Sequence, residues 1–141
     1  MIKIYFSTNQ IDENLSEFEL GDIEIEIDGQ IISSKNKKPD QSMMIFIAIC
    51  DLLDGIKAML KSRKKEFVFV GADSSFTLFF KQNKNNVYII YNSKKYIVSL
   101  IEFALSLRDS VNSFLEENKR FLNKESGVIQ DLYESLKGFP I

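Results

Sequence analysis

A run of apolar residues in the middle of the chain is the clearest pattern in the sequence. Residues 43–50 are all apolar, so a helix formed from them would need cover on more than one side. Polar residues then recur at spacings of three or four, which places them on one face of a helix. They are Asp51, Asp54, Lys57 and Lys61. The pattern predicts a central, largely buried helix over about residues 41–62, capped at its start by Asp40 or Ser42.

Strict alternation of apolar and charged residues marks the N-terminal region. In residues 23–27 three isoleucines alternate with two glutamates, which predicts a strand with the isoleucines on its core face. The following Asp28-Gly29 pair is typical of a two-residue hairpin turn, so residues 30–33 should form the returning strand. Residues 2–6 alternate in the same way and predict an opening strand.

Four further stretches are rich in β-branched and aromatic residues. They span residues 67–70, 76–80, 87–91 and 96–98. Polar residues with turn character separate them, and this arrangement predicts an antiparallel meander.

The last third of the chain has a helical period. Ser99 with Glu102 three residues later matches a capping box and should open a helix. A break at Ser126-Gly127 separates it from a shorter helix, with Val128, Ile129, Leu132, Tyr133 and Leu136 inward and Gly138 as a C-cap. We therefore expect one domain, 1–141, of the α+β class. An antiparallel sheet of about six strands would pack against the central helix and two C-terminal helices, at about 100–123 and 127–137.

Charge is distributed unevenly along the chain. The net charge is −2, but residues 1–30 carry −7, residues 31–100 carry +7 and residues 101–141 carry −2. The first segment holds eight acids, among them Asp12 and Glu13. Part of this polarity should be satisfied inside the domain, and the remainder forms a field that can steer a charged partner.

Candidate catalytic chemistry is sparse. The chain has no histidine, which excludes Ser-His-Asp and Cys-His mechanisms. Its only cysteine, Cys50, lies in the apolar run and should be a buried small hydrophobe in a reducing, cytoplasmic setting. No phosphate-binding glycine motif occurs, and we expect no cofactor, no metal and no catalytic residue. A membrane helix needs about 18 apolar residues, and the longest apolar run here has eight, so no membrane partner is expected.

Paired carboxylates are one remaining candidate for chemistry. Glu24 and Glu26 should point to the same side of their strand, about 7 Å apart, with Asp28 next in line. They could form an oxygen-ligand metal site or an acid/base pair. The simpler interpretation, which we favour, is a solvent-facing surface, because nothing else in the segment would complete a coordination shell.

The loop 71–75 and the basic cluster 61–65 each admit two interpretations. Asp73 with its neighbouring serines could form a docking knob, or Asp73 could bond to its own turn, which we favour. The basic cluster, followed by Phe67 and Phe69, could bind nucleic acid. We favour a solvated helix end, since the chain is net acidic and has fifteen lysines against three arginines.

The layout resembles small single-domain bacterial immunity proteins, which accompany polymorphic or contact-dependent growth-inhibition toxins. The resemblance rests on Asp28-Gly29, the central apolar helix, the segment 71–76 and the two closing helices. It implies a non-enzymatic cytoplasmic protein that binds one cognate toxin domain and blocks it.

A toxin nuclease carries a basic cleft, so an acidic surface would be steered towards it. The residues expected to face such a partner are Glu17, Glu19, Asp22, Glu24, Glu26, Asp28, Asp73, Ser74 and Ser75. The alternative is a nucleic-acid or regulatory binding module that uses residues 61–65. An enzyme using Glu24 and Glu26 or Asp73 is the third and least favoured class.

Overall fold

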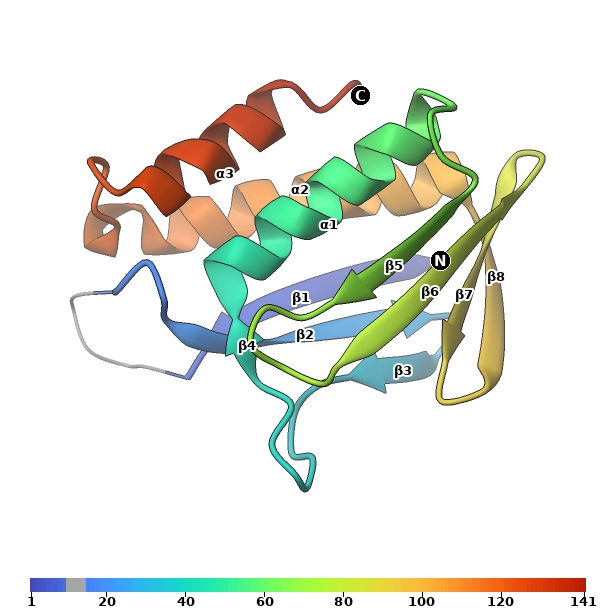
Figure 1. The fold of residues 1–141 in the computed structure, drawn as a ribbon, viewed down its shortest axis with the longest axis horizontal. Coiled ribbons are helices and arrows are strands. Elements are labelled where there is room, and N and C mark those ends of the chain that lie inside the picture. Colours follow the sequence, from blue (N-terminus) through green and yellow to red (C-terminus); the bar gives the residue numbers. More distant parts are fainter. Residues whose placement is uncertain (10–14) are drawn as a thin grey trace.

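The computed structural model describes residues 1–9 and 15–141, so Asp12 and Glu13 lie outside the described residues. Two antiparallel sheets of four strands each pack with three α-helices, which confirms the α+β class. In Figure 1 the helices lie across the top of the molecule and both sheets lie below them. Among the described helices, none is long and apolar enough to cross a membrane.

The first sheet is built around the predicted hairpin. It contains β1 (Ile2–Thr8), β2 (Leu20–Ile27), β3 (Gln30–Ser33) and β4 (Met43–Met44). β1 and β3 flank β2, and β4 pairs with the beginning of β2. Ile27 lies opposite Gln30, and both residues of the turn have positive φ, 48° at Asp28 and 84° at Gly29, as a two-residue hairpin of this type requires. The hairpin prediction is confirmed.

The second sheet is the predicted meander. It contains β5 (Glu66–Val70), β6 (Thr77–Asn83), β7 (Asn86–Tyr91) and β8 (Lys94–Ser99), paired in chain order. The sequence predicted one sheet of about six strands, whereas the structure has eight strands in two sheets. Alternation of apolar and polar residues predicts a strand and its buried face, but it does not predict which strands pair. Here a helix lies between the last strand of the first sheet and β5, which begins the second sheet.

That helix is α1 (Ile45–Leu60), which begins four residues later than predicted. Met43 and Met44 instead form β4, which pairs with β2, so Met44 is the N-cap and no side chain of the described residues caps the helix. The predicted capping by Asp40 or Ser42 is therefore wrong. Asp40 accepts a hydrogen bond from the Ser42 amide at 2.9 Å, and the Ser42 hydroxyl donates to the carboxylate of Asp22 in β2.

Helix α1 is enclosed as expected. Most of its large apolar side chains are fully buried, including Phe46, Leu52 and Ile56. The predicted polar stripe carries Asp51, Asp54 and Lys61 on the exposed side. Cys50 is half-buried rather than enclosed.

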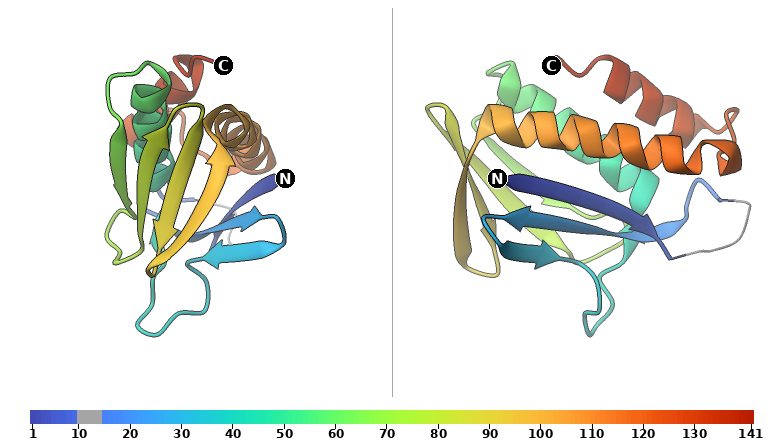
Figure 2. Two further views of the ribbon diagram at one scale, coloured as in Figure 1. Left: turned by 90° about the vertical axis from the view of Figure 1, so that its right-hand side faces the viewer. Right: turned by 180° about the vertical axis from the view of Figure 1, so that it is seen from behind.

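Two C-terminal helices complete the fold. α2 (Leu100–Asn118) is followed by a 3₁₀ turn at Lys119–Phe121, so the α-helix ends five residues before the predicted boundary, and α3 (Gly127–Lys137) matches its prediction. Ser99 and Ser126 cap the two helices by accepting amide hydrogen bonds, and Gly138 is the C-cap of α3. Tyr133 was predicted to face inward but is 39% exposed. Seen from behind in Figure 2, α2 runs along the outer side of β1.

Candidate functional site

The outer face of the first sheet carries the predicted pair of glutamates. Ile23, Ile25 and Ile27 are buried, so Glu24 and Glu26 point away from the core. Glu26 lies between Lys3 and Ile31 in the strand register. Glu24 lies between Tyr5 and Ser33, whose hydroxyl donates to its carboxylate at 3.1 Å. We call Tyr5, Glu24, Glu26, Ile31 and Ser33 the acidic face.

Charge on the acidic face is only partly balanced. Within the described residues neither Glu24 nor Glu26 forms an ion pair. Asp28, at the hairpin, forms an ion pair with the amino group of Met1 at 2.7 Å. This contact raises the pKa of the Met1 amine. The negative charge of this face therefore comes from the two glutamates, and Lys3, opposite Glu26, is the positive charge next to them.

Asp22 has a structural role that its sequence position does not indicate. Its side chain is buried and accepts hydrogen bonds from Ser34 at 2.8 Å and Ser42 at 3.3 Å. The Ser34 hydroxyl also accepts from the Ile23 amide, so the three side chains join β2 to the segments after β3. This burial corrects the expectation that Asp22 faces a partner.

Glu17 and Glu19 hold the chain before β2 in place. The Glu17 carboxylate accepts from the hydroxyl of Ser126, the N-cap of α3, and Glu19 accepts from the Ser16 amide at 3.3 Å. Both are half-buried. Glu24 and Glu26 are half-buried as well, so the two pairs differ in position and contacts: Glu17 and Glu19 bond within the chain before β2 and to α3, whereas Glu24 and Glu26 lie on the outer face of β2.

The corner after β5 links the two sheets. The Ser74 hydroxyl donates to the Gln41 carbonyl at 2.7 Å and accepts from the Phe76 amide at 3.1 Å, while the Met44 amide donates to the Ala72 carbonyl at 2.9 Å. Asp73 and Ser75 are exposed. The turn was expected to be held by Asp73, but the side chain that holds it is Ser74.

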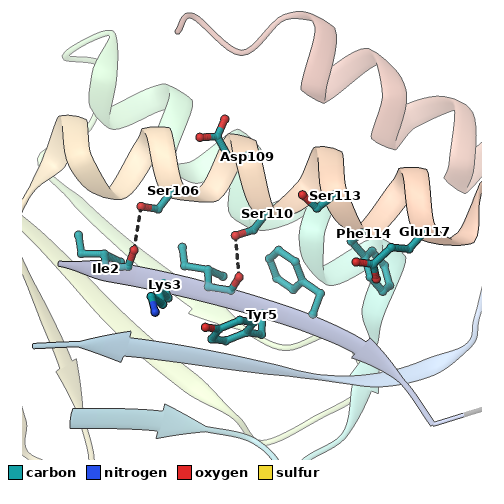
Figure 3. Close-up of a pocket in the computed structure, with 11 residues that line it drawn as sticks. Ile2, Lys3, Tyr5, Ser106, Asp109, Ser110, Ser113, Phe114 and Glu117 are labelled. Carbon is teal, nitrogen blue, oxygen red and sulfur yellow. Dashed lines mark hydrogen bonds between the residues drawn. The ribbon is translucent and has the colours of Figure 1, made fainter. Parts of the chain in front are cut away.

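A groove of about 550 Å³ separates β1 from α2 and was not anticipated from the sequence (Figure 3). On its floor Ser106 donates to the Ile2 carbonyl at 3.2 Å and Ser110 donates to the Ile4 carbonyl at 2.6 Å. The two serines are four residues apart on one helical face, and that spacing is the signal that could have revealed them. Their hydroxyls are used to bind β1 and are not arranged as nucleophiles beside a base.

One cluster joins a thiol, a hydroxyl and a carboxylate across α1 and α3. Ser135 donates to Asp54 at 2.8 Å, and its oxygen lies 3.2 Å from the Cys50 sulfur. Burial raises the pKa of the Cys50 thiol, and nearby carboxylates raise it further. Because the thiolate is the reactive form, this environment makes Cys50 a poor nucleophile, and the cluster acts as a contact between helices.

The basic cluster 61–65 is exposed, but the aromatic residues after it are not available to a ligand. Phe69 is buried, and the Phe67 ring packs against Phe80 with centroids 5.6 Å apart. Neither ring is fully exposed beside the basic cluster, which weakens the aromatic support for a nucleic-acid surface.

No group of three or more potential metal-ligating side chains occurs among residues 1–9 and 15–141. Comparison with protein-family models, with curated proteins and with solved structures finds no match to this chain.

Proposed function

We propose that this protein is a non-enzymatic immunity protein that binds and neutralises a cognate bacterial toxin domain through the acidic face. The observation that carries the proposal is the pair of outward glutamates on β2, which have no ion-pair partner within the described residues. A toxin domain with a basic active-site cleft, such as a nuclease, would be attracted to this charge.

Flanking side chains give the acidic face more than charge. Tyr5 is 52% exposed and Ile31 is 60% exposed, and each lies one strand away from a glutamate. Aromatic and apolar side chains beside charged groups supply the water-excluding contacts that most interfaces need. A rigid sheet presents them without a cost of ordering a loop.

The proposal is tested by reversing charge at two matched places. Glu24→Lys with Glu26→Lys should prevent the protein from protecting cells against the cognate toxin domain, and should lower affinity for the purified domain about tenfold or more. The control is Asp131→Lys with Glu134→Lys, which makes the same change in net charge at exposed positions of α3.

Both variants should keep the thermal stability of the parent within a few degrees. Full protection by the β2 variant, with the same affinity and the same salt dependence as the control, would exclude the acidic face as the binding surface.

A further inference from the structure

β5 is an outermost strand of the second sheet, and its free side is open. The Gln82 amide donates to the Lys65 carbonyl, and the Gly71 amide donates to the Phe76 carbonyl, both at 2.8 Å. Because pairing directions alternate along an antiparallel strand, the backbone groups of Val68 and Val70 must point away from β6. Within the described residues no hydrogen bond reaches these outward groups.

A groove of about 370 Å³ runs along this open edge. One wall is the strand itself, Phe67 to Val70, and the other is the side of α1 that carries Asp51, Asp54 and Ala58. Gly55 lets the two walls meet at the base, because a Cβ there would overlap the Phe67 ring. Figure 1 shows β5 directly below α1 with β6 on one side of it, and no described strand pairs with its other side.

The helical wall of this groove is negatively charged. Among the described residues neither Asp51 nor Asp54 is in an ion pair, although Asp54 accepts from Ser135. Partial burial beside β5 raises the pKa of Asp51, and the charge of Asp54 raises it further. A cation placed between the two carboxylates would relieve this repulsion. Lys64 also lines the groove, in the turn that leads from α1 to β5.

Apolar side chains cover the adjoining outer face of the second sheet. Val68 and Val70 are each 50% exposed, and Phe79, opposite Val68, is 49% exposed. A strand added beside β5 would place alternate side chains next to this apolar surface and the others under α1.

We propose that the β5 edge binds an extended segment of a protein partner as an added antiparallel strand, one in which lysine or arginine alternates with apolar residues. The cationic side chains face Asp51 and Asp54, and the apolar side chains lie beside Val68 and Val70. The site is on the other sheet from the acidic face and stands independently of the proposed function.

Other edges and a second copy of the chain fit these observations less well. The edge of β1 is occupied by the serines of α2, and β8 begins with Lys94 and Lys95, a type of residue that opposes edge pairing. Pairing of β5 with another β5 would bring a second Asp51 and Asp54 to the same face, where like charges repel.

A model peptide tests the geometry directly. The probe is a capped octapeptide that alternates lysine and valine, titrated into the ¹⁵N-labelled protein. Residues opposite Val68 share its face of the sheet, so the valine amides of the peptide should point to β5 and the lysine amides to solvent. N-methylation of the valines should therefore weaken binding about tenfold or more, whereas N-methylation of the lysines, which gives an isomer of the same composition, should leave binding nearly unchanged.

Hydrogen exchange and charge variants complete the test. The parent peptide should slow exchange of the Val68 and Val70 amides. Asp51→Asn with Asp54→Asn should weaken binding about fivefold at low salt and less at high salt. The control, Glu116→Gln with Glu117→Gln at exposed positions of α2, should leave peptide binding unchanged.

Three results would overturn the proposal: no binding at millimolar peptide, equal binding of the two methylated isomers, or unprotected Val68 and Val70 amides in the complex. Glu24→Lys with Glu26→Lys should leave peptide binding intact, so this site and the acidic face can fail separately.

Discussion

β1 and β5 are both outermost strands that run beside a long helix, but among the described residues only on β1 does the helix bond to outward carbonyls of the strand. Helix α2 presents Ser106 and Ser110, whose hydroxyls donate to the carbonyls of β1. Helix α1 presents Asp51 and Asp54 to β5, and an ionised carboxylate has no proton to donate. Packing a helix beside an edge strand therefore does not by itself protect the edge. The side chains on the facing surface of the helix decide whether the backbone groups are satisfied.

The largest effect should come from separating α1 from β5. Gly55→Leu places a side chain where the Phe67 ring lies, and the displaced ring would lose its stacking on Phe80. We expect a loss of about 2 to 3 kcal/mol in the free energy of unfolding, measured by urea denaturation. Gly127→Leu is the control, because a Cβ at Gly127 meets no atom within 4 Å. Equal stability of the two variants would show that the contact between α1 and β5 is loose.

Opening the closed edge should have a smaller effect. Ser106→Ala with Ser110→Ala removes both hydroxyl donors from the carbonyls of β1, and we expect a loss of about 1 to 2 kcal/mol by the same measurement. Ser113→Ala changes an exposed serine of the same groove that makes no hydrogen bond to β1 and should cost almost nothing. If the double variant is as stable as this control, the serines do not close the edge.

The smallest effect should be a gain in stability when the charge of Asp51, beside the open edge of β5, is removed. Burial and Asp54 raise the pKa of Asp51, so the folded state binds the proton of this carboxyl more tightly than the unfolded state does. At a pH above the ordinary carboxyl pKa of 3.8, ionised Asp51 therefore opposes folding. At a pH below 3.8 the carboxyl is protonated in both states and this effect disappears. Asp51→Asn should stabilise the protein by up to about 0.5 kcal/mol at pH 7, and the gain should fade at pH 3.

The control for this variant is Glu125→Gln, which removes the same charge at an exposed position. A gain for Asp51→Asn that is equal at both pH values would contradict the assigned cause.

Local sequence patterns predicted most elements of the fold. The Asp28-Gly29 hairpin, the cap at Ser99, the break before the last helix and the meander each depend on residues close together in the chain, and each is confirmed. The start of α1 was wrong for a physical reason. Met43 and Met44 belong to a run that is apolar on every side, so they carry no period that distinguishes a strand from a helix.

The candidate surfaces were only partly predictable. Alternation in β2 correctly placed Glu24 and Glu26 on its outer side. It could not show that Asp22 is buried, because its partners Ser34 and Ser42 are 12 and 20 residues away. The open edge of β5 was equally hidden, since only the order of strands in the sheet decides which strand is outermost.

The serines that close β1 have a consequence for synthesis on the ribosome. The hydroxyl that donates to the Ile2 carbonyl lies 104 residues later in the chain, and the hydroxyl that donates to the Ile4 carbonyl lies 106 residues later. The strands of the first sheet lie within residues 1–44, so they leave the ribosome well before α2 does. Until α2 emerges, the nascent sheet has an uncovered β1 edge and depends on dilution or chaperones to remain unpaired.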